Sequence, residues 1–355
     1  MQVGRARWVW SLSSAALLLA CGGRAELDAP GAGASSMATS GGAAASGANA
    51  TAAGTGGSSG EGGSLHGRIA TVETSTSELA IYPPNPVAGS APLARIGGMI
   101  EQEYCPDLAF DSRANLYLIC DTSPSDDPAH IDVFAPDTTG EATPSRRISG
   151  MDTTLGGDGL VRLGIDGAGS IHLLQVNYTA YPAIGVLTVF APDAAGDASP
   201  IHTALITGDG IASPNALALD ASGQVLVGYS WSGMVRVFAA NADGTPAPIR
   251  EFGTNVDDGS EGIIDLAVDD SGLIYVLTSV QLRVYGPSAA NDDPPLRVVT
   301  FDIDAPPAGL DVAKDGRVFL ATGEGVSVLS ASANGAAMPL FTFGTATKNA
   351  IAIAP

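Results

Sequence analysis

Short runs of alternating apolar and polar residues recur along the chain, separated by turns rich in Gly, Pro, Asp and Asn. The segment Leu217–Val227, LALDASGQVLV, places an Asp-x-x-Gly turn between two such runs. This alternation predicts two half-buried strands joined as a hairpin, with the Asp and Gly serving the turn. Related patterns occur in four further segments: Leu108–Leu118, Leu163–Leu173, Leu266–Val276 and Leu310–Leu320.

A long turn is repeated downstream of these hairpins. In six copies an aromatic residue or Leu is followed ten residues later by Pro: Tyr82 and Pro92, Phe134 and Pro144, Phe190 and Pro200, Phe238 and Pro248, Tyr285 and Pro295, and Leu329 and Pro339. Six residues after the aromatic position stand residue types that tolerate a left-handed backbone, namely Gly140, Gly196, Gly244, Asn291 and Gly335; the first copy has Gly89 one place later. Pro is tolerated where a strand edge faces solvent, so we expect each Pro to begin an outermost strand.

Six such units, each with four predicted strands, indicate an all-β fold, a six-bladed β-propeller. The chain ends in Asn349–Pro355, which reads as an innermost strand with nothing after it. Near the other end, Gly67–Tyr82 lacks an innermost strand before it. We therefore predict that the C-terminal strand completes the first blade and closes the ring.

The repeat spacing over Ser64–Pro355 resembles six-bladed propellers of the NHL-like kind and, more distantly, the gluconolactonase/regucalcin-like group. The Asp that usually follows the second strand of an NHL repeat is present at Asp121, whereas Tyr229 and Leu277 stand at the equivalent positions. The segment SPNALALD, with Asn215, resembles the Pro-Asn-Gly segment of the gluconolactonase-like group. In that group such positions supply oxygen ligands for a divalent metal.

The first residues predict a secretory signal peptide. Arg5 and Arg7 precede an apolar run from Trp8 to Ala20, which is too short for a mature membrane-spanning helix. The tetrapeptide Leu18–Cys21 resembles the bacterial lipobox, which implies lipidation of Cys21; the alternative is an ordinary signal peptide with an incidental Cys. Gly22 follows instead of the Asp that favours inner-membrane retention. The resemblance thus implies an outer-membrane lipoprotein that faces the periplasm or the cell surface.

Composition divides the chain into three parts. Residues 1–20 form the predicted signal peptide, and residues 21–63 are Gly-, Ala-, Ser- and Thr-rich, with no periodic apolar face. We expect a disordered tether there and the propeller over 64–355. The formal net charge is −21, from 16 Lys and Arg against 37 Asp and Glu, which disfavours nucleic acid as a partner. The acidity is explained by solubility or, alternatively, by an acidic ligand surface; nothing marks an oligomer interface, so we expect a monomer.

Two further cysteines, Cys105 and Cys120, flank one predicted hairpin. If this hairpin pairs like its relatives, the two residues are opposite each other or nearly so, close enough for a disulfide. Export past the inner membrane favours oxidation. A disulfide that staples one blade is therefore predicted, with two buried free thiols as the alternative.

A ligand site is expected where the innermost strands begin around the central channel. Candidate polar residues at or near these strand starts are Glu103, Asp107, Asp158, Arg162, Asn215, Glu261, Asp265 and Asn349. An acidic mouth with one Arg suits Ca²⁺ or a cationic or sugar-like ligand, although a hard cation needs about six to eight oxygens. The alternative is a set of solvated loop acids. We assign no catalytic residue and no obligatory cofactor, and the identity of any metal stays unknown.

These features favour a membrane-anchored propeller that acts as a binding scaffold in the bacterial cell envelope, with a protein or glycan partner. The inventory offers no local catalytic motif: the four His residues lack zinc-ligand spacing, and GYSWSG (Gly228–Gly233) is not a nucleophile elbow. The alternative function is a divalent-metal-dependent lactonase- or hydrolase-like enzyme with its site at the central channel.

Overall fold

The structure is a computed structural model that describes residues 65–74, 78–97, 104–121, 129–156, 159, 161–178, 182–208, 212–253, 262–301 and 307–355. All of them belong to the unit Gly60–Pro355. The predicted signal peptide, Cys21 and the whole predicted tether region, residues 21–63, fall outside the described residues. No helix in the described ranges has the length and hydropathy needed to cross a membrane.

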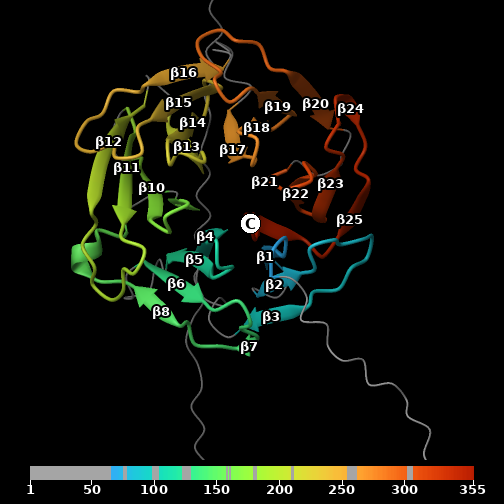
Figure 1. Cartoon of the computed structure of the whole chain (residues 1–355), viewed down its shortest axis with the longest axis horizontal. Coiled ribbons are helices and arrows are strands. Elements are labelled where there is room, and N and C mark those ends of the chain that lie inside the picture. Colours follow the sequence, from blue (N-terminus) through green and yellow to red (C-terminus); the bar gives the residue numbers. More distant parts are fainter. Residues whose placement is uncertain are drawn as a thin grey trace, which may run out of the picture. The chain divides into compact units, whose positions relative to one another are not determined.

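The described strands form six blades around a central axis, as the sequence predicts (Figure 1). In blade order, the innermost strands are β26 (Thr347–Ile353), β4 (Tyr104–Phe110), β9 (Val161–Ile165), β13 (Pro214–Leu219), β17 (Ile263–Val268) and β21 (Gly309–Val312). The second strands are β1 (Ile69–Glu73), β5 (Leu116–Asp121), β10 (Ile171–Asn177), β14 (Val225–Tyr229), β18 (Ile274–Thr278) and β22 (Val318–Thr322).

The two outer positions of each blade follow the same order. The third strands are β2 (Leu79–Tyr82), β6 (His130–Phe134), β11 (Ile184–Phe190), β15 (Met234–Phe238), β19 (Gln281–Tyr285) and β23 (Gly325–Leu329). The outermost are β3 (Ala94–Gly97), β8 (Arg146–Ile148), β12 (His202–Thr207), β16 (Arg250–Gly253), β20 (Arg297–Phe301) and β25 (Phe341–Phe343). Each outermost strand begins two residues after a repeated Pro, which confirms the predicted position of these prolines.

The C-terminal strand closes the ring. β26 pairs antiparallel with β1, placing Ile353 opposite Ile69 and Ile351 opposite Thr71. Blade 1 is thus built from both ends of the described chain, as predicted. A buried hydrophobic cluster fills each junction between neighbouring blades, including the junction of blades 6 and 1 around Phe343 and Ile351.

The repeated long turn reaches back to the preceding blade. The amide of Gly196 donates to the carbonyl of Arg147 on β8, and the carbonyl of Gly196 accepts from Ser149, at 2.7 and 2.9 Å. Equivalent parallel pairings join β7 (Gly140–Glu141) to β3 and β24 (Gly335–Ala337) to β20. Gly196 has φ 60°, and a Cβ there would meet no atom within 4 Å, so the backbone angle and not space requires glycine.

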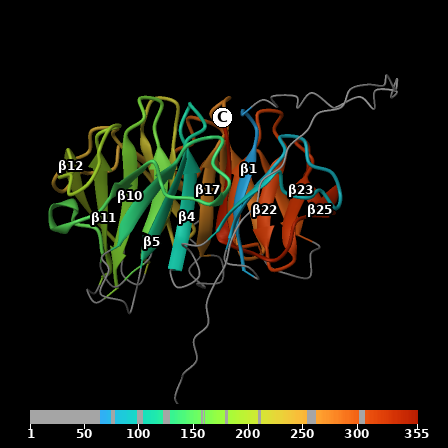
Figure 2. The same ribbon diagram turned by 90° about the horizontal axis from the view of Figure 1, so that it is seen from below.

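The ring therefore has two faces, visible edge-on in Figure 2. We call the end at which the innermost strands begin the start face. The other end, the turn face, carries the Asp-x-x-Gly hairpin turns and the six long turns. In the hairpin of blade 4, Asp220 Oδ1 accepts from the amides of Ser222 and Gln224 at 2.9 Å each, which confirms that this Asp serves the turn.

Candidate functional site

The innermost strands surround a central channel that encloses about 190 Å³. Most of the residues that line it are aliphatic, but three carboxylates are among them: Asp107 on β4, Asp265 on β17 and Asp311 on β21. The inner edge of an innermost strand has amide groups that no further strand pairs, so the channel must satisfy them in another way.

Each of the three carboxylates bridges two innermost strands. One carboxylate oxygen accepts a hydrogen bond from the next backbone amide on its own strand. The other oxygen accepts from a backbone amide on the innermost strand of the following blade. The bonds between blades join Asp107 to Leu163 and Asp265 to Leu310, at 2.8 Å each, and Asp311 to Ile353 at 2.7 Å. These aspartates thus link the blades and satisfy part of the exposed inner edge.

Arg162 provides a cation in this region. Its side chain extends from β9 to blade 5, where Nη2 donates to the carbonyl of Ile264 at 3.2 Å. The residue is buried, and its Nε has no hydrogen-bond partner among the described residues. The positive charge lowers the pKa of both Asp107 and Asp265 and so favours their ionised forms.

Burial nevertheless dominates and raises the pKa of all three carboxyls. For Asp265, burial and the nearby charge of Asp107 outweigh the effect of Arg162 and raise the pKa to about 7. Burial also raises the pKa of Asp311 to about 7, against the stabilising amides of Val312 and Ile353. Both residues are partly accessible because they line the channel, yet protein surrounds them on every other side.

These shifts predict a decrease in stability with rising pH. A carboxyl whose pKa is raised on folding stabilises the protein fully below its unfolded-state pKa, and this contribution is lost as pH rises toward 7. Relative to the parent chain, Asp311→Asn should gain at least about 1 kcal/mol of unfolding free energy between pH 5 and 8, the equivalent of roughly one pKa unit. Urea unfolding of both proteins at several pH values measures this difference.

The matched control is Asp315→Asn, on the exposed hairpin turn of the same blade. Between pH 5 and 8, its unfolding free energy should change with pH in the same way as that of the parent chain. Comparing variant with parent also cancels the opposite contribution of His172, whose pKa burial lowers. If Asp311→Asn also ran parallel to the parent, ionisation of Asp311 would not affect stability.

The structure gathers part of the predicted site. Asp107, Arg162 and Asp265 come together around the channel, as described above. Asn215 lies at a β-bulge of β13, where its Nδ2 donates to the carbonyl of Ile263 at 2.7 Å. Asn349 belongs to β26, but its side chain is not described, and Glu103, Asp158 and Glu261 fall outside the described residues.

Sequence reasoning did not identify Asp311. The sequence nevertheless marks this Asp as unusual, because the corresponding position in four of the other repeats is occupied by a small residue, namely Ala109, Gly164, Ala218 and Ala267. Within the described ranges, no group of three His, Cys, Asp or Glu residues is arranged to hold a metal ion. A metal site at the channel therefore stays a prediction that depends on the undescribed acids.

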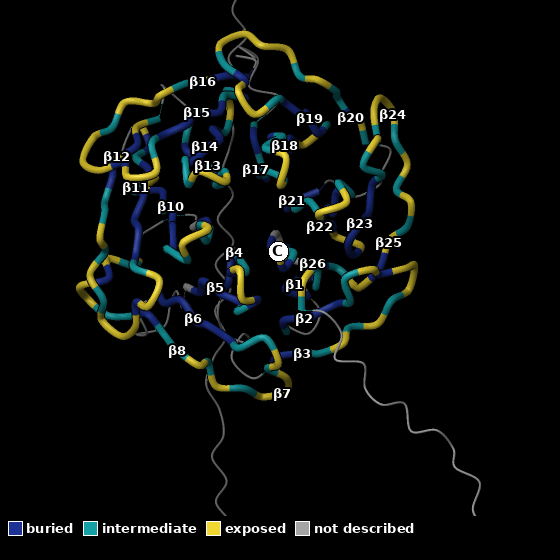
Figure 3. Tube along the Cα trace, viewed as in Figure 1, coloured by how far each residue is buried: buried dark blue, intermediate teal, exposed yellow. Residues whose placement is uncertain are grey.

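The start face carries exposed apolar side chains on three consecutive blades. Tyr178, Trp231 and Val280 occupy the turn between the second and third strands of blades 3, 4 and 5, and each is at least half exposed. Trp231 also has φ 69°, a left-handed conformation that is unusual for a bulky residue. Figure 3 shows the buried strands and the exposed turns that connect them.

No protein-family model matches this chain, and no curated protein matches it in sequence. The fold is similar to that of a protein of unknown function from Bacteroides caccae, with 11% identity, a TM-score of 0.54, and 81% of this chain and 98% of that chain covered. It is also similar to the WD40 β-propeller domain of Doa1, with 11% identity, a TM-score of 0.51, and 81% and 83% covered. These similarities establish the propeller fold alone.

Proposed function

We propose that this chain is a lipid-anchored binding scaffold of the bacterial cell envelope, which contacts a protein partner through its start face. The observation that carries the proposal is Trp231. The residue is 56% exposed, and its backbone adopts a left-handed conformation that costs roughly 1–2 kcal/mol in a non-glycine residue. Strain of this kind concentrates at functional sites, and Trp is enriched at the energetic centres of protein interfaces.

Other features support the proposal. The channel carboxylates are engaged by backbone amides, so they link blades and need no substrate to satisfy them. The disulfide between Cys105 and Cys120 suits a protein exported to an oxidising compartment. The lipobox-like Leu18–Cys21 and the following Gly22 suit anchoring at the outer membrane.

Photo-crosslinking in the cell tests the proposal. A photoreactive residue replaces Trp231 in one variant and Ala221 in a control variant; Ala221 is exposed on the same blade but at the turn face. We expect a discrete protein adduct from position 231 and none from position 221. No adduct from either position, or equal adducts from both, would count against a partner at the start face.

Trp231→Gly separates binding from folding. Glycine adopts φ 69° without strain, so removing the indole should change the melting temperature by no more than a few degrees. The same variant should lose most of its affinity for the crosslinked partner, by at least about tenfold if Trp231 is a central contact. After removal of Trp8 and Trp10 with the signal peptide, Trp231 is the single Trp, so its fluorescence reports binding directly.

If the Trp231→Gly protein bound its partner with unchanged affinity, Trp231 would not contribute to the interface. A large decrease in melting temperature would show that the indole supports the fold. The two measurements together distinguish a contact residue from a structural one.

A further inference from the structure

Exposed aliphatic residues follow the repeated prolines on the turn face. In five of the six blades the residue directly after the Pro is a large aliphatic with more than half of its surface exposed: Leu93, Ile201, Ile249, Leu296 and Leu340. The backbone amide of each pairs with the third strand of its own blade, for example Leu340 with Val328 at 2.8 Å. These hydrogen bonds explain why the backbone of each residue lies where it does, but they do not explain why an apolar side chain is exposed there.

Blades 6 and 1 differ from the others in charge. Their long turns, residues 330–340 and 83–93, contain no charged residue, whereas the corresponding turns of blades 2 to 5 each contain at least one Asp or Glu. The same two turns carry a second exposed apolar residue each, Met338 at 69% and Val87 at 65% exposure. The two turns follow one another along the rim of the ring (Figure 1).

Basic residues accompany this apolar sector. The hairpin turn of blade 6 carries Lys314 and Arg317 against one acid, Asp315. Arg317 pairs with Asp315 at 2.7 Å and also donates to Asn85 in the long turn of blade 1, at 3.1 Å. Lys314 is exposed, so this part of a strongly acidic molecule has a local positive charge.

The chain enters the ring in the same sector. The amide of Gly67 donates to the carbonyl of Ala354 at 2.6 Å, which places the start of the described chain at the turn face of blade 1. Gly67 lies against Pro84, since a Cβ on Gly67 would be 3.0 Å from the Cβ of Pro84. The preceding segment, with the predicted lipid anchor at Cys21, therefore joins the ring beside the apolar turns.

We infer that the apolar sector of blades 6 and 1 rests on the surface of the phospholipid bilayer to which the chain is tethered. Val87, Leu93, Met338 and Leu340 enter the interface, and Lys314 contacts lipid phosphates. The inference rests on the proposed anchoring, because a Gly- and Ser-rich tether of the predicted length would reach roughly 35 Å and would keep the ring close to the membrane. The tether has only Leu27 and Met37 as large apolar residues, too few to cover the sector itself.

Co-sedimentation with vesicles tests the inference without the anchor. The probe is the mature chain with Cys21→Ser, mixed with vesicles of phosphatidylcholine and phosphatidylglycerol. We expect the chain to bind, and the combined variant Val87→Ser, Leu93→Ser, Met338→Ser and Leu340→Ser to bind at least about tenfold more weakly. The matched control, Ile201→Ser, Ile249→Ser and Leu296→Ser, changes the same turn position in blades 3 to 5 and should bind like the parent.

Three outcomes would overturn the inference. The parent chain does not sediment with vesicles, or the control variant loses binding as strongly as the sector variant. Alternatively, light scattering without lipid shows a dimer that only the sector variant abolishes, which would make a second copy the occupant. Equal melting temperatures of the parent and both variants establish that the comparison concerns folded proteins.

The proposed lipid anchor and the proposed membrane-docking surface can be tested independently. Incorporation of labelled palmitate into the parent chain, but not into Cys21→Ser, tests lipidation of Cys21. Vesicle binding by a chain that is not lipidated in the cell would support the docking surface and contradict the proposed anchor. Lipidation without vesicle binding by the unlipidated chain would keep the anchor and remove the docking surface.

Discussion

A chain that ends at Thr345 is expected to lose its cooperative thermal transition. The truncation removes β26, which supplies the innermost strand of blade 1 and pairs with β1 from Ile69 onward. It also removes Ile351 from the hydrophobic cluster between blades 6 and 1. Finally, Asp311 loses the amide of Ile353.

The expected loss exceeds the stability of an ordinary domain. A missing innermost strand exposes apolar surface on two blades and leaves unpaired the backbone groups of β1 that face β26, while the total free energy of unfolding is only about 5–15 kcal/mol. Calorimetry and near-ultraviolet circular dichroism measure the result. We expect no calorimetric peak and no fixed aromatic signal from the truncated chain.

A circular permutant is the matched control. Gly67 and Ala354 are already hydrogen-bonded, so a short linker from Pro355 to Gly67 would turn β26 and β1 into a covalent hairpin. Opening the permuted chain at Ala346 then keeps every strand of the ring. We expect it to melt cooperatively, within several degrees of the parent. A truncated chain that melts like the permutant would show that β26 does not hold the ring closed.

The repeated pattern was sufficient to predict the six blades because five of them are local in sequence, as are the three outer strands of blade 1. Every hairpin and long turn lies within one unit, so periodicity indicates it directly. The missing first strand and the extra last strand then imply closure. The contact between Gly196 and β8 was not predictable in this way, since the positive φ was recognisable but its hydrogen-bond partner belongs to the preceding blade.

The channel was predicted less completely because its contacts cross between blades. Asp107 and Asp265 stood out by position, but their role depends on the amides of Leu163 and Leu310, many residues away. Asp311 acts in the same way from a position two residues further along its strand, so a search at one fixed repeat position passed over it. The prolines predicted the outermost strands. The exposed aliphatic residues beside them could be recognised as one apolar sector only once the turns were assigned to neighbouring blades.

The double variant Cys105→Ala and Cys120→Ala is expected to lose at least about 3 kcal/mol of unfolding free energy. The disulfide joins β4 and β5 across a sequence separation of 15, and closing a loop of that size restricts the unfolded chain by about this amount. The predicted pairing is thus confirmed, with a β-bulge between Tyr104 and Asp107 that sets Cys120 opposite two residues of β4.

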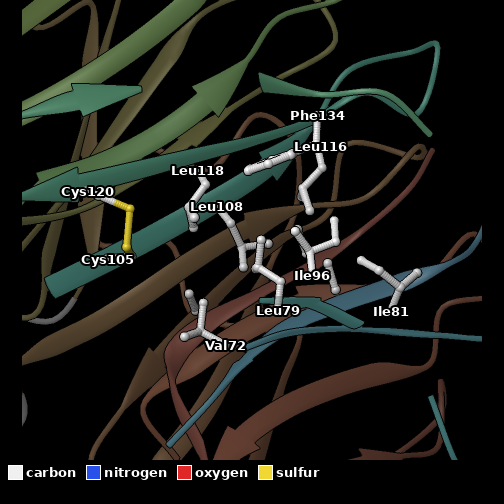
Figure 4. Close-up of a cluster of buried hydrophobic side chains, with 13 residues drawn as sticks. Val72, Leu79, Ile81, Ile96, Cys105, Leu108, Leu116, Leu118, Cys120 and Phe134 are labelled. Carbon is white, nitrogen blue, oxygen red and sulfur yellow. A yellow bond between two sulfur atoms is a disulfide. The ribbon is translucent and has the colours of Figure 1, made fainter. Parts of the chain in front are cut away.

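Loss of packing adds to the loss of the crosslink. Both cysteines are buried in the cluster between blades 1 and 2, together with Val72, Leu108 and Leu118 (Figure 4). The melting temperature should therefore decrease by at least roughly 6–12 °C for a domain of this size. Refolding the parent chain under reducing conditions should give a similar decrease through loss of the crosslink alone, whereas reductant should not affect the double variant. If the parent chain had the same melting temperature in both redox states, the disulfide would not stabilise the fold by restricting the unfolded chain.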